Sequence, residues 1–139
     1  MKKKSIVTLI VLFTVVCCTR YGYCSEQTPE QFVHDFYEWY FKADQGEDSP
    51  GHSDEIYNFV SKKTVGYARE EHTGVYYFTR VAGQLGDEHA VVGKAIPVNK
   101  DIFIVPVTFE KSKERIVVIL RKENGRLYIT KVMDIYPHL

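Results

Sequence analysis

The stretch TPEQFVHDFYEWYFK, residues 28–42, places six aromatic side chains in about four turns of a predicted helix. Thr28, Pro29 and Gln31 form a helix start: a hydroxyl can cap the first turn, a proline needs no amide partner there, and a glutamine can bond back to the cap. The polar side chains share one narrow arc, and the apolar side chains span roughly half of the circumference. A face this wide needs a curved surface to cover it, because a flat sheet contacts only one stripe of a helix.

The second half of the chain supplies a candidate for that surface. Four segments read as strands separated by turns: AVVGKAIPV, DIFIVPVTFE, ERIVVILRK and RLYITKVMDIY. The last turn is centred on Asn124-Gly125, which is the strongest short-range signal for a two-residue hairpin. Pro106 lies within its strand and predicts a bulge or bend, a usual way of curving a sheet.

The Asn-Gly turn also predicts the strand register. The expected pairs are Arg115 with Asp134, Val117 with Val132, Ile119 with Thr130, and Arg121 with Tyr128. A three-residue turn at 111–113 would place Phe103, Val105, Val107 and Phe109 on the face of Val117 and Ile119. The other face would then carry Ile104, Ile116, Val118, Leu120, Ile129 and Met133. Because both faces are apolar, we expect each to be covered in part, and a homodimer through the sheet stays open.

Two shorter segments separate the long helix from the strands. Residues 53–60 form a capped amphipathic segment that predicts a second helix, and residues 64–71 predict a third. Helices therefore come first and an antiparallel meander comes last, which is typical of the α+β class. We expect N-terminal helices packed on a curved antiparallel β-meander.

The phrases PEQFVHDFYEWYF and NGRLYITKVMDIY, with the short helices between them, resemble the nuclear transport factor 2-like fold. More narrowly, the chain is similar to a family of small exported bacterial proteins and lipoproteins with that fold. Many relatives have an aromatic residue and an aspartate in the last strand, where this chain has Leu127 and Thr130. The resemblance implies a cone made by the bent sheet, and the side chains expected to fill it are Phe32, Val33, Phe36, Tyr37, Tyr40 and Phe41.

The N-terminus has the pattern of a secretory signal peptide. Three lysines precede an apolar run over residues 6–16, which is well short of the ~20 residues that a bilayer-spanning helix needs. Small residues near the cleavage point favour a mature start at Ser25, so that residues 1–24 are the signal peptide and residues 25–139 a single domain. Lipid attachment at Cys17 or Cys18 is the alternative, but neither follows a small residue. We expect a periplasmic protein with no stable membrane span after cleavage.

The mature domain is acidic and lacks cysteine. Cleavage removes Lys2, Lys3, Lys4 and Arg20, so 14 of the 18 basic residues and all 18 acidic residues remain, and the net charge of the mature domain is −4. All three cysteines belong to the signal peptide, so stability must come from the core. Scattered lysines on an acidic domain argue against a nucleic-acid partner.

No motif for catalysis, cofactor binding or metal binding is present in the sequence. The histidines have no metal-ligand spacing, there is no nucleophile elbow, and the glycines at 83 and 86 lack the lysine of a phosphate loop. We therefore expect no cofactor, no metal and no enzymatic activity. Because some relatives with this fold are isomerases or dehydratases, a cavity stays open as a hypothesis, and its candidate residues are Tyr37, Tyr40, Arg115, Tyr128 and Asp134. The alternative for these residues is a cross-strand ion pair with tyrosines that only pack.

The segment ADQGEDSPGHSDE, residues 43–55, is acidic and contains no lysine or arginine. Its acidic side chains are Asp44, Glu47, Asp48, Asp54 and Glu55. One interpretation is a solvated connection whose charges favour the start of the next helix. The other is a partner-binding surface for a basic cleft of another protein, where charge complementarity speeds association.

These features together predict a non-catalytic protein-binding domain of the periplasm. By analogy with other small exported single domains, the expected role is that of an immunity protein that inhibits a cell-wall-targeting effector of the type VI secretion system. The alternative is a cone that binds a small ligand or a lipid, with weak isomerase-like chemistry.

The intact mass of the mature protein tests the export prediction. We expect the mass of residues 25–139 with no added lipid, because cleavage before Ser25 removes all three cysteines. Replacing Cys17 and Cys18 by serine should leave that mass unchanged. A lipid-modified N-terminus that disappears in the double variant would show an anchored form instead.

Overall fold

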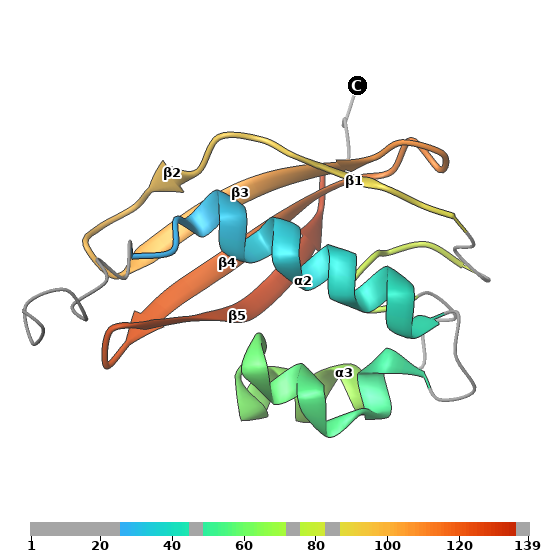
Figure 1. Ribbon diagram of the computed structural model, residues 1–139, viewed down its shortest axis with the longest axis horizontal. Helices are drawn as coiled ribbons and strands as arrows, with labels where there is room; N and C mark the ends of the chain where they lie inside the picture. Colours follow the sequence, from blue (N-terminus) through green and yellow to red (C-terminus); the bar gives the residue numbers. More distant parts are fainter. Residues whose placement is uncertain (1–25, 45–48, 72–75, 83–86, 136–139) are drawn as a thin grey trace, which may run out of the picture.

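The computed structural model describes residues 26–44, 49–71, 76–82 and 87–135. It shows helices packed against an antiparallel sheet, which confirms the predicted α+β class (Figure 1). The predicted signal peptide, residues 1–24, lies outside the described residues. The helical elements are α2 (Pro29–Asp44), the 3-10 turns η1 (Pro50–His52) and η2 (Asp54–Asn58), and α3 (Lys62–Glu70). The strands are β1 (Ala90–Val92), β2 (Ile96–Pro97), β3 (Ile102–Phe109), β4 (Arg115–Glu123) and β5 (Arg126–Asp134).

The long helix α2 begins where the sequence predicts. The Gln31 N–H donates to the Thr28 hydroxyl at 3.2 Å, the Phe32 N–H donates to the Thr28 carbonyl at 2.9 Å, and Pro29 is the first helical residue. The Gln31 side chain does not return to the cap, because its amide donates to Asp35 at 2.7 Å. Thr28 alone therefore provides the side-chain cap, and Gln31 braces the polar face of the helix.

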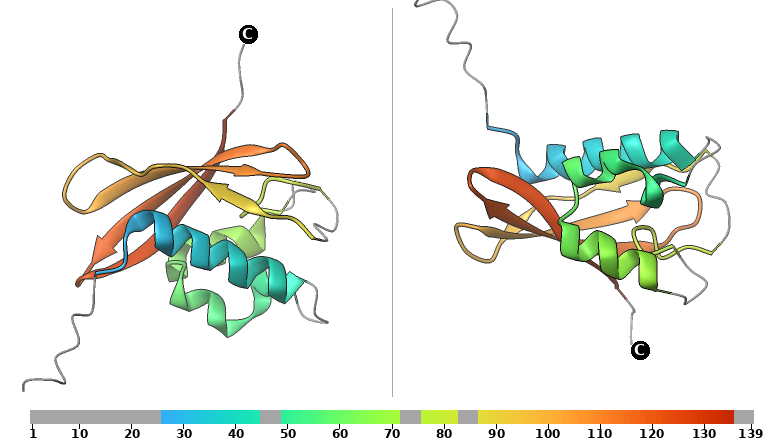
Figure 2. Two further views of the ribbon diagram at one scale, coloured as in Figure 1. Left: turned by 45° about the horizontal axis from the view of Figure 1, so that its top comes forward. Right: turned by 90° about the horizontal axis from the view of Figure 1, so that it is seen from below.

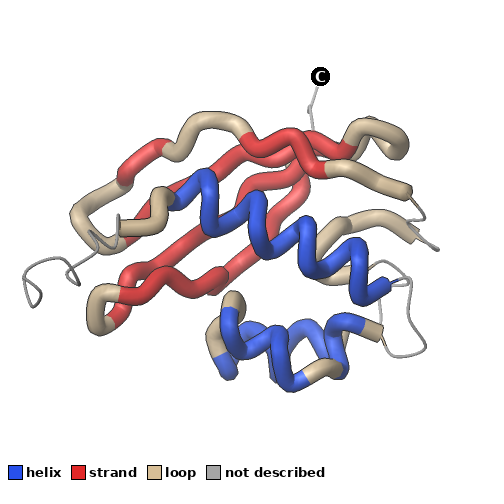
Figure 3. The backbone as a smooth tube through the Cα atoms, viewed as in Figure 1, coloured by secondary structure: helices blue, strands red, loops and turns tan. Residues whose placement is uncertain are grey.

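The apolar face of α2 forms the centre of the core, and α2 lies across the strands (Figure 3). Phe36 meets Phe59 and Phe78 at ring-centroid separations of 5.6 and 5.5 Å, in the edge-on geometry that aromatic rings favour. Tyr37 meets Phe109 of β3 at 5.3 Å, and its hydroxyl donates to the Phe78 carbonyl at 2.7 Å. The buried residues of α2 are those predicted: Phe32, Val33, Phe36, Tyr37, Tyr40 and Phe41.

The two shorter predicted helices are both present in altered form. The segment predicted as a helix over 53–60 forms only the 3-10 turn η2, and the helix predicted over 64–71 is α3, which begins two residues earlier. Ser53 and Ser61 cap them, each accepting a backbone N–H of the following turn, at 3.2 and 3.3 Å.

Trp39 joins η2 to α2. Its indole N–H donates to the Glu55 carboxylate at 2.8 Å, and its ring stacks on Phe59 with centroids 5.5 Å apart. The Trp39 side chain is half-buried, and the hydrogen bond to Glu55 uses its one polar group, the indole N–H. The 3-10 segment is therefore fastened to the long helix by both a polar and an apolar interaction.

The strands form one antiparallel sheet in the order β1-β3-β4-β5, and β2 pairs with β3 on the same edge as β1. The segment predicted as one strand over 90–98 is thus interrupted at Gly93. The Gly93 N–H donates to the Pro106 carbonyl at 2.8 Å, and a Cβ at Gly93 would lie only 2.8 Å from the Pro106 side chain. The break in this edge therefore lies beside the proline at which we predict a bend.

Strands β3 and β4 pair one residue away from the predicted register. The Phe109 N–H donates to the Glu114 carbonyl at 2.9 Å, so the connection has four residues, 110–113, and not three. Lys113 closes this turn with a φ of 61°. Val105 consequently lies opposite Val118, and its predicted place on the face of Val117 and Ile119 is wrong.

The corrected register separates the two faces of the sheet. The inner face, beneath α2, carries the buried side chains Val105, Val107, Phe109, Ile116, Val118, Leu120, Leu127, Ile129 and Val132. The opposite face, called the outer face below, carries Ile102, Ile104, Pro106, Val117, Ile119 and Met133. Both faces are apolar, as predicted, but their membership differs because a slip of one residue exchanges the faces of a strand.

The β4–β5 hairpin confirms the predicted Asn-Gly turn. Asn124 and Gly125 have φ values of 51° and 79°, the left-handed backbone that a type I′ turn requires. Arg121 lies opposite Tyr128, as predicted from this turn.

A β-bulge changes the rest of that register. It falls between Ile119 and Leu120, and Thr130 is the extra residue: its hydroxyl donates to the Ile119 carbonyl at 3.1 Å. The Thr130 carbonyl accepts the Thr64 hydroxyl of α3 at 2.9 Å, so the bulge is also where α3 attaches to the sheet. Beyond it the observed pairs are Val118–Val132, Val117–Met133 and Ile116–Asp134, and the predicted pairs Ile119–Thr130, Val117–Val132 and Arg115–Asp134 are wrong.

The carboxylate of Glu88 stabilises the turn between β3 and β4. It is 3% exposed and accepts the backbone N–H groups of His89, Lys111 and Ser112 at 3.1, 2.7 and 2.9 Å. Burial alone would raise the pKa of Glu88, but these hydrogen bonds outweigh it and the pKa is lowered. The folded protein therefore favours the ionised carboxylate.

We predict that Glu88→Gln lowers the free energy of unfolding near neutral pH by about 1–3 kcal/mol, since an amide offers one neutral acceptor oxygen. Because the folded-state pKa is depressed, the carboxylate contributes fully above its unfolded pKa of ~4.3, and the contribution is lost as the pH falls through the folded value. Urea unfolding near pH 7 and near pH 3 measures this, and the gap between wild type and variant should narrow in acid. Glu110→Gln, at an exposed position, is the matched control, and a gap that does not change with pH would contradict the role of Glu88.

Candidate functional site

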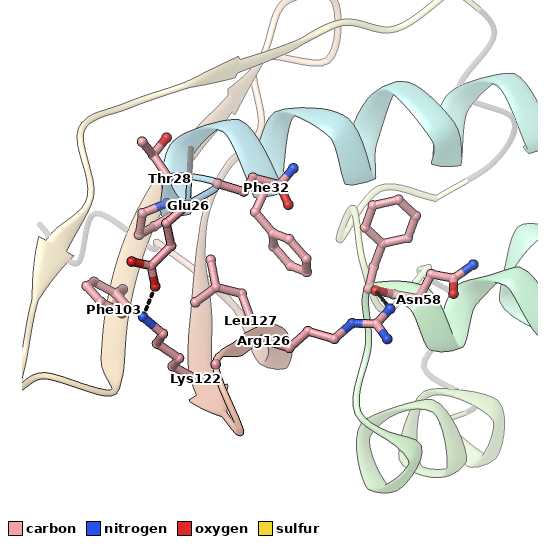
Figure 4. A pocket seen from close by; sticks show the side chains of 12 residues that line it. Glu26, Thr28, Phe32, Asn58, Phe103, Lys122, Arg126 and Leu127 are labelled. Carbon is pink, nitrogen blue, oxygen red and sulfur yellow. Dashed lines mark hydrogen bonds and ion pairs between the residues drawn. The ribbon is translucent and has the colours of Figure 1, made fainter. Parts of the chain in front are cut away.

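One pocket lies between the start of α2 and the β4–β5 hairpin, and is called the end pocket below (Figure 4). Its volume is about 490 Å³, and its apolar wall consists of Phe32, Phe59, Phe103 and Leu127. Lys122 forms an ion pair with Glu26 across it, and Arg126 donates to the Asn58 carbonyl at 2.9 Å. The end pocket thus combines apolar walls with two cationic side chains, within the usual size range of small-molecule sites.

The five residues predicted to line a cavity are not brought together. Tyr37 and Tyr40 lie in the core, 0% and 3% exposed, and burial raises the pKa of both hydroxyls. Arg115 is exposed at the start of β4, and Tyr128 is half-buried near the hairpin. Asp134 is paired across the strands with Ile116 and not with Arg115. None of the five lines the end pocket.

Asp134 instead belongs to an ion cluster with Arg80 and Glu71. Arg80 donates through Nε to both Asp134 oxygens at 3.1 and 3.2 Å, and through a terminal nitrogen to both Glu71 oxygens at the same distances. The side chains of Glu71, Arg80 and Asp134 are 14%, 18% and 9% exposed. Burial alone would lower the pKa of Arg80, but its hydrogen bonds and the charges of the two carboxylates raise it, so the guanidinium stays charged.

The backbone of Arg80 is held in an unfavourable conformation. Its φ is 56°, a left-handed value that costs a residue with a Cβ on the order of 1 kcal/mol. Each carboxylate shares one guanidinium nitrogen between its two oxygens, and these contacts offset the strain because hydrogen bonds between charged groups are roughly twice as strong as neutral ones. The ion cluster therefore fixes the path of residues 76–82 beside the sheet.

A larger concavity, called the α3 groove below, runs between α3 and the sheet beside β5. Its volume is about 1020 Å³. Ile102, Ile119 and Met133 of the outer face line it, so the groove lies on the side of the sheet away from α2 (Figure 2 shows α3 beside β5). The helical wall includes Lys63, Thr64 and Tyr67 with Tyr77 and the ion cluster, and the sheet wall includes Ile102, Ile119, Arg121, Lys131 and Met133.

The predicted acidic surface is described only in part. Glu47 and Asp48 lie outside the described residues. Asp44 is half-buried at the end of α2, whereas Asp54 and Glu55 are exposed on η2, where Glu55 accepts the indole bond described above. Asp44 belongs to α2 and the other two to η2, which the Trp39–Glu55 hydrogen bond fastens to α2.

Within the described ranges, no three His, Cys, Asp or Glu side chains are placed to hold a metal ion. Of the helices in that part of the chain, none is both long enough and apolar enough to cross a membrane. Three poorly exposed carboxylates have structural partners: Glu71 and Asp134 bind Arg80, and Glu88 binds backbone N–H groups.

Two solved structures resemble the chain over most of its length. The first is the crystal structure of the native type VI effector–immunity complex Tae3–Tai3 from Ralstonia pickettii, matched with a TM-score of 0.72 and 25% identity over 81% of this chain and 99% of that chain. The selenomethionine form of the same complex is matched with a TM-score of 0.67 and 25% identity over 81% and 100%. The helices packed on an antiparallel sheet are consistent with the fold of the immunity protein Tai3. No protein-family model and no curated protein matches the chain.

Sequence reasoning missed the ion cluster because nothing local in the sequence announces it. Arg80 is 54 residues from Asp134 and lies in a segment without a helical or strand pattern. The bulge at Thr130 then moves Asp134 away from the partner that the hairpin alone would give it. The sequence contains one related signal: both faces of the predicted sheet are apolar, which indicates that part of the chain packs against the second face as well.

We predict that Arg80→Gln lowers the free energy of unfolding by about 2–4 kcal/mol, because it leaves two poorly exposed carboxylates without a cation. The matched control is Lys111→Ala, which removes an ion pair with Asp87 whose side chains are 58% and 86% exposed. That change should cost less than about 1 kcal/mol. Urea unfolding compares the two, and equally small losses would show that the cluster does not hold the fold.

Proposed function

We propose that this chain is an immunity protein that binds and blocks a type VI secretion effector. The observation that carries the proposal is the match to Tai3, which extends over 99% of that chain at 25% identity. Because one fold can serve many functions, the proposal also needs surfaces suited to binding a protein. The chain has two such surfaces, the α3 groove with the outer face and the exposed acidic side chains of η2.

The chemistry of the described residues supports a non-catalytic role. Tyr37 and Tyr40, which could have served as acids in an open cavity, are buried in the aromatic core. The carboxylates of Glu71 and Asp134 are neutralised by Arg80 and hold the fold. An inhibitor needs a preorganised surface and not a reactive group, because rigidity reduces the entropy lost on binding.

The proposal extends to the compartment and to the target. We propose that residues 1–24 direct export, that the domain acts in the periplasm, and that the effector attacks the cell wall. The packing of α2 on a curved sheet supports the relation to nuclear transport factor 2-like proteins. One of two alternative docking surfaces that we propose is acidic and would suit a basic region of the effector, and its residues are Asp44, Glu47, Asp48, Asp54 and Glu55.

A second candidate function is the binding of a small ligand or lipid in the end pocket. The observation that favours it is the combination of an apolar wall, at Phe32, Phe59 and Leu127, with the Arg126 guanidinium and with Lys122, whose charge Glu26 of the same pocket already pairs. Such a pocket suits an amphipathic anion.

Affinity capture of the tagged mature protein, from the periplasm of cells grown in dense contact, distinguishes the two functions. We expect a stoichiometric complex with an effector, a Kd on the order of nanomolar, and inhibition of the effector's peptidoglycan hydrolysis. The control is an unrelated exported domain of similar size carrying the same tag. If native mass spectrometry shows the protein alone, or with a small bound mass, the end pocket becomes the better explanation.

A further inference from the structure

The outer face of the sheet is an exposed apolar surface. Strands β1 and β2 extend the outer face, because Val91 pairs with Thr108, Ile96 with Ile104, and the Val98 N–H donates to the Ile102 carbonyl. Of the six large apolar side chains that are exposed among the described residues, four lie on this face: Val91 at 52%, Ile96 at 58%, Val98 at 57% and Met133 at 39%. Half-buried apolar side chains lie between them, namely Ile102, Ile104, Pro106, Val117 and Ile119. Contiguous apolar surface of this kind is typical of a binding site, whereas isolated exposed apolar residues are ordinary.

The α3 groove continues this surface beyond β5. Ile119 and Met133 belong both to the outer face and to the groove. Tyr67, 61% exposed, stands on the opposite wall, and its ring meets Tyr77 at 5.8 Å. Tyrosine is enriched in protein interfaces because it offers a rigid apolar body with a polar tip. Because α3 rises beside the sheet, a protein partner can insert a side chain or a loop into the groove, whereas a flat bilayer would contact only the top of this wall.

Basic side chains border the apolar centre. Arg115 and Arg121 extend from β4 and Lys131 from β5, and all three are exposed. In strands β3, β4 and β5, which are described throughout, Glu123 is the one carboxylate that the register places on this face. The outer face is therefore basic at its border, although acidic residues outnumber basic ones in the mature domain.

This charge pattern discriminates between occupants. A two-fold dimer places a surface against a copy of itself. Such an interface would hold both copies of Arg115, Arg121 and Lys131, with Glu123 as the one carboxylate that β3, β4 and β5 contribute to this face, so like charges would oppose association. A partner with carboxylates around an apolar patch would satisfy both features of the face.

We propose that the outer face together with the α3 groove is the surface that binds the effector, and that the effector presents an apolar patch bordered by Asp and Glu side chains. This inference rests on the proposed function and assigns its docking surface. The ion cluster of Glu71, Arg80 and Asp134 lines the groove and keeps its helical wall in place, so the surface is formed before the partner arrives.

The double variant Arg121→Glu and Lys131→Glu tests the assignment. The probe is the purified effector that co-purifies with the tagged wild-type chain, and binding is measured by interferometry at low and high salt. We expect Kd to weaken by roughly 100-fold at low salt, about tenfold for each reversed charge, mainly through slower association, and the difference to shrink at high salt. Inhibition of peptidoglycan hydrolysis should weaken in parallel.

Two further variants complete the design. Met133→Glu places a charge in the apolar centre and should weaken binding about tenfold or more at every salt concentration, since its effect is desolvation and not steering. Lys42→Glu is the matched control, because Lys42 lies on the solvent side of α2 with its side chain 79% exposed. It should change Kd by less than about twofold. Urea midpoints confirm that each variant is folded.

The outcomes separate this inference from the proposed function. If wild type binds and inhibits the effector while the outer-face variants behave like Lys42→Glu, the docking surface is wrong and the proposed function stands. Loss of binding in Asp54→Lys together with intact outer-face variants would place docking on the acidic surface. A wild-type chain that binds no effector overturns both. If this chain forms a dimer that Met133→Glu dissociates, the outer face binds a second copy of the chain. If the wild type is retained on phosphatidylglycerol vesicles and the double variant is not, while effector binding persists in both, the outer face binds a membrane.

Discussion

The wide aromatic face of α2 is the constraint on which the rest of the structure depends. Six side chains of one helix are buried, and they occupy more of its circumference than a flat sheet can contact. The chain meets this demand with a sheet that is broken at Gly93 on one edge and bulged at Thr130 on the other. The 3-10 segment and residues 76–82 cover the flank of the helix that the sheet leaves open, through Phe59 and Phe78.

The fold could be predicted from the sequence where local signals are strong. Helix capping at Thr28 and the Asn-Gly turn are decided by a few neighbouring residues, and the predicted buried set of α2 follows from helical periodicity alone. The β4–β5 register could be predicted only for the pairs next to the turn, because it depends on a bulge held by Thr64, and the β3–β4 register could not be predicted, because it depends on a four-residue turn held by Glu88. Both holding residues lie far from the turn or strand they adjust, so no local pattern reveals them.

The same limit explains what was missed in the candidate site. The Asn-Gly turn predicts Arg115 as the partner of Asp134, but the bulge gives Asp134 a different strand neighbour, and Arg80 reaches it from a segment without regular structure. The apolar character of both sheet faces was correctly predicted, because both alternating sets of residues in these strands are apolar and a slip of one residue only exchanges the sets between the faces. Which side chains form the outer face, and that Arg121 and Lys131 border it, became clear only from the observed pairing.

Trp39 is the single tryptophan of the chain, and its position makes the intrinsic fluorescence sensitive to one part of the molecule and insensitive to another. Its indole is bonded to Glu55 and stacked on Phe59, so its fluorescence senses the packing of η2 against α2. The outer face lies on the opposite side of the sheet. Emission from this side chain therefore follows the assembly of the helical side, while an event confined to the outer face and the α3 groove would leave it spectroscopically silent.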